Sequence, residues 1–237
     1  MVYNNERNRK LYSIFIMSYI DALYKKDEDK IYVVERDPKK GRVFVEYDAR
    51  YVFYYPDARG KHRSITGKTL QKVQCRTSKE FIKEQRIRSN KVLYEQDINP
   101  VFRCLEENYL GKDTPKLNVL FFDIEVDFDP EKGYATTNDP FMPITAISCY
   151  MEWTDQLITF AVPPNTLTMQ EAKVLTERFP NTMLFEKEKD MLDAFLQLVE
   201  DADILSGWNS EGYDIPYTVG RIQKVLSSDD TRRLCFW

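Results

Sequence analysis

Histidine is almost absent from this chain of 237 residues, which contains only His62. A histidine-rich metal site and a Ser–His–Asp triad are therefore poor explanations of any activity. The four cysteines are widely spaced, and no two of them form a Cys-x-x-Cys pair: Cys75, Cys104, Cys149 and Cys235. This spacing argues against a zinc site and a disulfide scaffold, and it fits a reducing cytosol. Any chemistry must then use carboxylates, lysine, tyrosine or water.

Long apolar runs are also missing, and no segment is long enough to span a bilayer. Basic residues at positions 7–10 precede the apolar residues 11–17, a pattern that resembles a signal peptide. The run is short, polar residues follow it at Ser18 and Asp21, and there is no small-residue cleavage site. We interpret it as a helix, a strand or a disordered leader. We expect the protein to be cytoplasmic, in the host cell if it is viral, with no membrane partner.

Charge is divided unevenly along the chain, although the net charge is only −4. Residues 1–116 hold 25 Lys and Arg against 17 Asp and Glu, a net charge of +8. Residues 117–237 hold 9 against 21, a net charge of −12. Such asymmetry suggests that a basic module contacts phosphates while an acidic one holds cations. The alternative is that two solvated surfaces differ without functional meaning.

With 237 residues, the chain can hold one large or two small domains. Because 43% of the residues are apolar and 30% are charged, we expect a packed core. Residues 112–116 are the best linker, so we predict domains at 1–116 and 117–237. The first is predicted to be rich in β-structure. Its strands are expected at residues 31–35, 43–47, 51–55 and 70–74, and its helices at residues 78–88, capped by Ser78, and 101–109. Residues 37–41, with Pro38 and Gly41, are predicted to turn the first two strands into a hairpin.

The second half is predicted to be a three-strand meander followed by helix, strand and helix, which gives an α/β fold with a mixed sheet. Its strands are expected at residues 117–126, 144–152, 157–162, 183–185 and 203–208, the last being fully buried. Its helices are expected at residues 169–179, 186–200 and 213–226. The helix at 186–200 is amphipathic, with one apolar face made of Met191, Leu192, Phe195, Leu196 and Val199.

Two carboxylates, Asp123 and Glu125, lie two positions apart in an apolar segment that is predicted to be a strand. Because side chains alternate along a strand, both acids point to one face. The other face is expected to be buried and consists of Phe122, Ile124, Val126 and Phe128. Neighbouring carboxylates repel each other unless a proton or a cation lies between them. Hard cations such as Mg²⁺ take oxygen ligands, so the pattern indicates a metal site. A solvated strand edge is the alternative.

A second acidic segment, residues 206–217, reads SGWNSEGYDIPY and places Asp214 just before a predicted helix. Together with Phe122-Asp123-Ile124-Glu125, it resembles the second and first exonuclease motifs of family B DNA polymerases. The wording is most similar to the replicative polymerases of T-even-like bacteriophages and their cyanophage relatives. Residues 32–57 also resemble the N-terminal domain of those phage enzymes, so the resemblance covers nearly the whole chain.

The resemblance implies a β-rich N-terminal domain followed by a partial ribonuclease-H-like 3′→5′ exonuclease domain. It also implies that Asp123, Glu125 and Asp214 are catalytic and hold two Mg²⁺ or Mn²⁺ ions, about 3.5–4 Å apart in sites of this kind. Asn209 and Tyr213 would then help to place the strand end. The implied reaction is the proofreading hydrolysis of a terminal phosphodiester in DNA replication, within an enzyme that is otherwise a DNA-directed nucleotidyltransferase.

The chain departs from the family pattern after Asp214, where only 23 residues follow. The family's third exonuclease motif and its polymerase domains are expected further along. We therefore expect an N-terminal portion of a polymerase, inactive or weakly active alone. It would be a fragment, a truncated frame or one half of a split polymerase. By resemblance its partners are DNA (a single-stranded 3′ end or a primer–template), a C-terminal polymerase chain and a sliding clamp.

Two other interpretations stay open. In one, the chain is a non-catalytic module that binds template or RNA through its basic half. In the other, it is an independent exonuclease that recruits its missing acid from within this sequence. The candidates for that acid are Asp127, Asp129, Asp139, Asp190 and Asp193, each of which is more typical of a turn or a helix surface.

Overall fold

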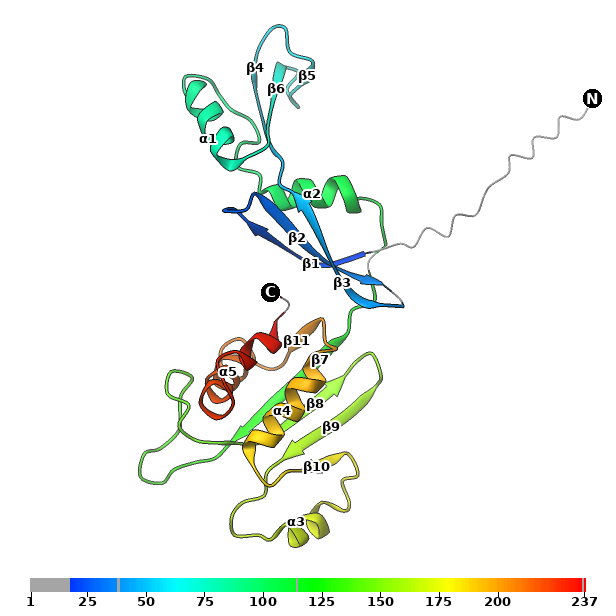
Figure 1. The fold of residues 1–237 in the computed structure, drawn as a ribbon, viewed down its shortest axis with the longest axis vertical. Helices are drawn as coiled ribbons and strands as arrows, with labels where there is room; N and C mark the ends of the chain where they lie inside the picture. The colour runs from blue at the N-terminus through cyan, green and yellow to red at the C-terminus, as the bar shows by residue number, and fades with distance from the viewer. Residues whose placement is uncertain (1–17, 38, 114, 236) are drawn as a thin grey trace, which may run out of the picture. The chain divides into compact units, whose positions relative to one another are not determined.

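The computed structural model describes residues 18–37, 39–113, 115–235 and 237. Figure 1 shows their helices and strands, which form two compact units, Met1–Pro115 and Lys116–Trp237. The apolar run at residues 11–17 lies outside the described residues. Among those described, no helix combines the length and the apolar character that crossing a membrane requires.

The first unit begins with an antiparallel sheet of three strands, β1 (Ser18–Lys25), β2 (Lys30–Asp37) and β3 (Gly41–Asp48). Strands β2 and β3 form the predicted hairpin, with Lys30 opposite Asp48 and Asp37 opposite Gly41. The Asp37 carboxylate accepts hydrogen bonds from the backbone N–H groups of Lys39 and Lys40. Gly41 then adopts the left-handed φ of 74°, which costs glycine little. Local turn chemistry therefore fixes the register of this sheet.

A second three-stranded sheet has the order β4–β6–β5, with β4 at Tyr51–Pro56, β5 at His62–Arg63 and β6 at Thr69–Cys75. Two helices follow, α1 (Ser78–Ile87) and α2 (Pro100–Tyr109). The prediction that Ser78 caps α1 is wrong. The cap is Thr77, whose hydroxyl accepts the Glu80 N–H at 3.2 Å, while the Ser78 N–H donates to Asp29. Because the two hydroxyl residues are adjacent, the sequence pattern alone does not distinguish them.

The second unit contains a five-stranded mixed sheet with the order β10–β9–β8–β7–β11. Strands β7 (Val119–Val126), β8 (Ile144–Met151) and β9 (Gln156–Ala161) are antiparallel neighbours and form the predicted meander. Strand β10 (Thr182–Leu184) runs parallel to β9, and β11 (Ile204–Ser206) runs parallel to β7. The prediction of an α/β fold, with a β-rich first part and a mixed sheet in the second, is confirmed.

One face of this sheet is covered by α4 (Glu188–Val199) and α5 (Asp214–Val225). Figure 1 shows α4 crossing the strands. The predicted apolar face of α4 is buried and joins Phe122 and Ile124 of β7 and Tyr217 and Ile222 of α5 in one core. Phe122 packs on Phe195 with ring centroids 5.4 Å apart, so it is a core residue. Helix α3 (Met169–Thr176) and the short 3-10 helix η1 (Asp230–Leu234) complete the unit.

Three details of the second unit differ from the prediction. Helix α3 ends at Thr176, three residues early. Strand β11 is short and not fully buried, because it is an edge strand, with Ile204 40% exposed. Phe128 is 46% exposed rather than buried, because the chain has left β7 by then and its ring packs locally on Tyr134.

Candidate active site

Strand β7 supplies the first two acids. Phe122 and Ile124 are buried against the helices, while Asp123 and Glu125 alternate with them and are exposed on the opposite face. Strand β8 pairs with β7 in the same sheet, and Ser148 lies opposite Asp123 in the ladder. The predicted common orientation of the two acids is therefore confirmed, and both are open to a ligand from solvent.

Asp214 contacts β7 along its other edge, the edge that faces β11 and not β8. The pairing between β7 and β11 stops where Ser206 meets Phe121, so beyond it no strand of the described residues pairs with this edge of β7. The chain then turns and begins α5 at Asp214. The Asp214 carboxylate accepts the Ile124 N–H at 3.3 Å and so satisfies a backbone group that the ladder no longer pairs. The Asp214 carboxylate therefore contacts the backbone of β7 at Ile124, the residue between Asp123 and Glu125.

Burial raises the pKa of the Asp214 carboxyl, which is only 4% exposed, and the negative charge of Asp123 adds to this effect. The Ile124 N–H opposes the rise by stabilising the charged form. Asp123 thus lies close enough for its charge to act on the Asp214 carboxyl. A bound cation would remove the repulsion between them, which is the electrostatic character expected of a metal-binding carboxylate pair.

The turn between β11 and α5 is tightly built. Asn209 adopts a left-handed φ of 53° and is exposed, and its backbone carbonyl accepts the N–H groups of Gly212 and Tyr213. The Tyr213 ring is half-buried and stacks on Tyr217, with ring centroids 5.4 Å apart. Asn209 is therefore accessible to solvent, whereas the Tyr213 ring is partly buried by its packing on Tyr217.

Gly207 allows this turn to approach β7, because a Cβ at that position would lie 2.3 Å from the Phe122 carbonyl oxygen. We expect Gly207→Ala to lower the free energy of unfolding by about 1–3 kcal/mol, since backbone must move to relieve the clash. Gly212→Ala is the matched control, because the atoms nearest to its Cβ would belong to the Asn209 side chain and not to the backbone. Urea unfolding of both variants measures the difference. Equal losses of stability in the two variants would show that the close approach of Gly207 to the Phe122 carbonyl does not require glycine.

A buried ion pair that the sequence analysis missed holds α5 in place. Arg221 donates through Nε to Glu188 Oε1 at 2.8 Å and through Nη1 to the Pro140 carbonyl at 3.0 Å. Glu188 Oε1 also accepts the Ile144 N–H at the start of β8. On the same helix, the Tyr217 hydroxyl donates to the Met142 carbonyl at 2.8 Å. The available signal was an arginine on the apolar stripe of α5, which implies a buried partner.

The donor set suits a hard cation, but no three His, Cys, Asp or Glu side chains are grouped closely enough to hold a metal ion in the described part of the chain. The structure brings Asp123 and Asp214 together and places Glu125 on the same face as Asp123. Three of the five alternative acids are engaged elsewhere. Asp129 accepts the N–H groups of Glu131 and Lys132, Asp139 pairs with Lys224, and Asp193 pairs with Arg233.

These features define an α/β domain with a solvent-facing carboxylate site on strand β7. The family described as DNA polymerase family B, exonuclease domain, matches residues 61–235, and the chain belongs to this family. The DNA-directed DNA polymerase of Escherichia phage RB69 is 27% identical over 80% of the chain and 24% of its own length. The DNA polymerase delta catalytic subunit of Plasmodium falciparum (isolate K1 / Thailand) is 28% identical over 66% of the chain and 14% of its own length.

A short stretch, 22% of the chain, is 38% identical to the DNA-directed DNA polymerase of Enterobacteria phage T4. The resemblance inferred from the two motifs is therefore confirmed at the level of the family. The chain spans about a quarter of the RB69 relative's length (24%) and 6% of the T4 relative's. The activities of those whole enzymes are accordingly not established for this chain.

Proposed function

We propose that this chain carries a metal-dependent 3′→5′ proofreading exonuclease site of a replicative DNA polymerase. The observation that carries the proposal is the contact of Asp214 with the backbone of β7 between Asp123 and Glu125. It joins two acidic segments that lie 90 positions apart in the sequence. A solvated strand edge gives no reason for that convergence.

Asp123, Glu125 and Asp214 are the residues that would hold divalent cations, two in a complete site. When bound, such ions supply charge stabilisation for phosphodiester hydrolysis. Asp123 and Glu125 face solvent, so a metal ion and its DNA substrate would approach them from there. Asp214 is held in one orientation by the Ile124 N–H. Asn209, exposed in the turn before α5, would contact the strand end, with Tyr213 as a weaker contributor.

The surrounding contacts support this assignment because they pre-organise the acids. Glu188 pairs with Arg221 of α5 and also accepts the Ile144 N–H at the start of β8. Strand β8 is the neighbour of β7, which carries Asp123 and Glu125. Positioning of this kind is what a site for charge stabilisation requires. Because no three His, Cys, Asp or Glu side chains of the described residues are grouped closely enough to hold a metal ion, we propose that these residues alone hydrolyse DNA slowly.

We further propose that residues 1–116 form the polymerase N-terminal domain and residues 117–237 the exonuclease part. The supporting observation is that the relatives are polymerases of much greater length. Polymerase function, primer–template DNA, a C-terminal polymerase chain and a sliding clamp belong to this proposal. With these partners, the proposal covers the complete replicative enzyme as well as the exonuclease site.

The test of the exonuclease assignment is the polarity of DNA shortening. Single-stranded DNA labelled at its 5′ end is incubated with excess protein and Mn²⁺, and products are resolved by length. We expect a slow ladder of strands shortened one nucleotide at a time from the 3′ end, which EDTA abolishes. Internal cuts, shortening from the 5′ end or the absence of any Mn²⁺-dependent product would contradict the proposal.

A further inference from the structure

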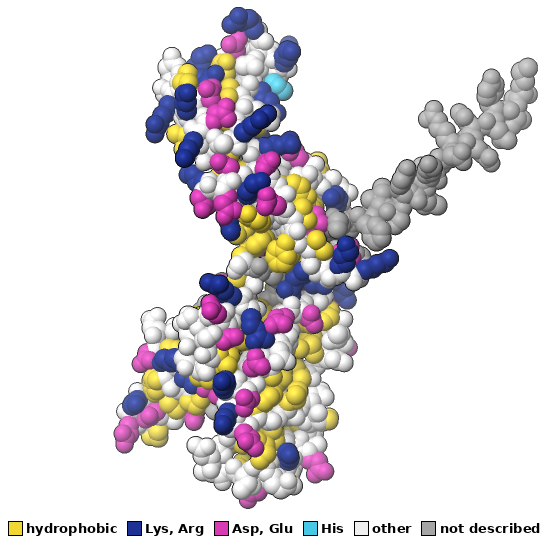
Figure 2. Space-filling view, viewed as in Figure 1, with side chains coloured by type: hydrophobic (Ala, Val, Ile, Leu, Met, Phe, Trp, Pro, Cys, Tyr) yellow, Lys and Arg dark blue, Asp and Glu magenta, His cyan; other side chains and the backbone are white. Residues whose placement is uncertain are grey.

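Positive charge in the first unit is concentrated around its second sheet. Residues 58–79 contain seven Lys or Arg and no Asp or Glu. Figure 2 shows Lys and Arg side chains gathered over β4–β6 and α1. Two of these residues, Arg63 and Lys68, flank the loop between β5 and β6, and neither forms an ion pair among the residues that the structure describes. This loop therefore carries positive charge that the described part of the unit does not neutralise.

A cavity of about 600 Å³ lies beside this loop, a volume typical of ligand sites. The one acid of its lining, Glu95, pairs with Arg103 at 3.1 Å. The cavity thus offers cations and apolar surface together, and its only carboxylate already has a cationic partner. It is lined by Arg63 and Lys68, by residues 64–66 of the loop, and by Tyr54, His62, Leu70, Tyr94 and Glu95.

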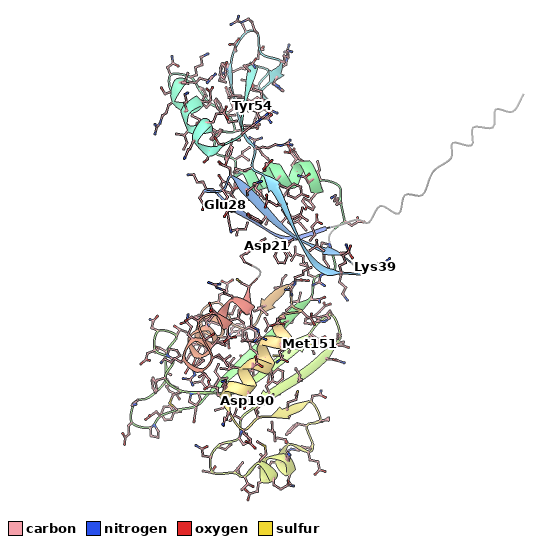
Figure 3. The ribbon with its side chains drawn as sticks, in the orientation of Figure 1. Asp21, Glu28, Lys39, Tyr54, Met151 and Asp190 are labelled. Atoms are coloured by element: carbon pink, nitrogen blue, oxygen red, sulfur yellow. The ribbon has the colours of Figure 1, made fainter. Side chains whose placement is uncertain are left out.

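The aromatic side of the cavity is fixed by backbone pairing. Tyr54 and Tyr94 exchange two backbone hydrogen bonds, of 3.0 and 2.8 Å, so their side chains are held side by side. The His62 ring packs edge-on against Tyr54, which Figure 3 labels on β4, with ring centroids 5.2 Å apart. Tyrosine and arginine are enriched among the residues that contribute most to protein–protein binding. The lining therefore has the composition of an interface centre.

The loop between β5 and β6 is pre-formed by its own hydrogen bonds. The Ser64 N–H donates to the Lys68 carbonyl at 2.9 Å, and the Gly67 N–H donates to the Ser64 carbonyl at 2.9 Å. This ordered loop nevertheless exposes Ile65 completely, at 107% of its reference area. Ile65 therefore adds nothing to the packing of the unit, and it lies at the cavity where a ligand can cover it.

Ile65 favours a protein ligand over a nucleic acid. Single strands are held by bases that stack on aromatic rings and by phosphates that contact cations. An aliphatic side chain provides neither contact, but it gains free energy when an apolar side chain of a partner covers it. An exposed isoleucine between two unpaired cations is therefore complementary to a surface that combines carboxylates with apolar side chains.

We propose that this cavity binds an acidic peptide segment of a partner protein. One large apolar side chain of that segment packs on Tyr54 and Tyr94 and is covered by Ile65. Its Asp or Glu side chains pair with Arg63 and Lys68. The site is independent of the exonuclease proposal, because every lining residue belongs to the first unit.

The test begins with random heptapeptides displayed on phage and selected on the whole protein. We expect the selected peptides to combine Asp or Glu with a Leu, Phe or Trp. One selected peptide is then synthesised with a fluorescent label, and its affinity is measured by anisotropy. Selection of basic peptides, or no enrichment of acidic ones, would overturn the proposal.

Ile65→Ala tests the apolar contact without a risk of unfolding, because the side chain is fully exposed. We expect it to weaken peptide binding by about fivefold or more, since apolar surface is no longer covered. Val92→Ala is the matched control, because Val92 is 65% exposed in the same unit and does not line the cavity. Equal affinities of the two variants would overturn the proposal.

Arg63→Ala with Lys68→Ala tests the ionic contacts. We expect this double variant to weaken peptide binding by about tenfold or more and to make it less sensitive to salt. The control, Lys79→Ala with Lys83→Ala, removes the same charge from exposed positions on α1, which does not line the cavity, and should change affinity less than threefold. Equal losses would overturn the proposal, because net charge alone would then explain binding.

A labelled twelve-nucleotide oligothymidylate in EDTA decides between protein and nucleic acid as the ligand. We expect Ile65→Ala to leave any oligothymidylate binding unchanged within twofold. An oligothymidylate that displaces the peptide, and that Ile65→Ala weakens to the same degree, would assign the cavity to nucleic acid and overturn the proposal. Asp214→Asn should bind the peptide as the unaltered protein does, so failure of the exonuclease proposal is recognised separately.

Discussion

Asp214→Asn is expected to reduce Mn²⁺-dependent shortening of DNA at least 100-fold, because it removes a charged metal ligand and keeps the shape of the side chain. A loss of that size corresponds to about 2.7 kcal/mol of transition-state stabilisation. The amide oxygen still accepts the Ile124 N–H, so stability should change little. Gel assays of the rate and urea unfolding measure the two effects.

Asp214→Ala separates the two roles of this carboxylate. It should lose activity to the same extent, but it should also lower the free energy of unfolding by about 1–3 kcal/mol, because the buried Ile124 N–H loses its acceptor. Glu211→Gln is the matched control, since it neutralises an exposed carboxylate in the same turn. If Asp214→Asn kept its activity within threefold, the carboxylate would serve only to satisfy the edge of β7.

Arg221→Met should lower the free energy of unfolding by about 3–5 kcal/mol, because it leaves Glu188 buried without its charge partner. The side chains of the pair are only 10% and 11% exposed, and Arg221 also donates to the carbonyls of Pro140 and Phe141. The substitution therefore leaves the Glu188 charge without its cationic partner and removes the Arg221 donor from two carbonyl groups. Urea unfolding of the second unit, followed by the fluorescence of its tryptophans, measures the loss of free energy of unfolding.

Lys224→Met provides the control on the same helix. Lys224 pairs with Asp139 at 3.1 Å, but the two side chains are 45% and 72% exposed, so we expect a loss below about 1 kcal/mol. The double variant Arg221→Met with Glu188→Leu should recover part of the stability, because both buried charges are gone. No recovery, or equal losses in Arg221→Met and Lys224→Met, would show that the buried pair does not anchor α5.

Local patterns predicted much of this fold because burial dictates them. The alternation along β7 placed Asp123 and Glu125 on one face, and the apolar stripe of α4 identified its buried residues. Where burial does not decide, the prediction was wrong. Thr77 caps α1 in place of its neighbour Ser78, and Phe128 is exposed because the chain leaves the sheet before it. Both errors concern the ends of elements, where neighbouring residues compete for one position.

The long-range contacts of the site were not predictable from spacing. The contact between Asp214 and Ile124 depends on where the β7–β11 ladder ends, and this is set by the whole sheet. Arg221 and Glu188 are 33 positions apart on different helices, so neither position indicates the other. The motif resemblance pointed to Asp214, but it gave no physical reason for its place. That reason is the unpaired edge of β7.

The most direct test of the carboxylate site is the position of Mn²⁺ in crystals of this protein, located by anomalous scattering. The account predicts a peak within about 2.5 Å of carboxylate oxygens of Asp123 and Asp214, with Glu125 turned toward it. The same crystals of Asp214→Asn should lose the peak. Manganese bound only elsewhere, or a peak that survives in Asp214→Asn, would contradict the account.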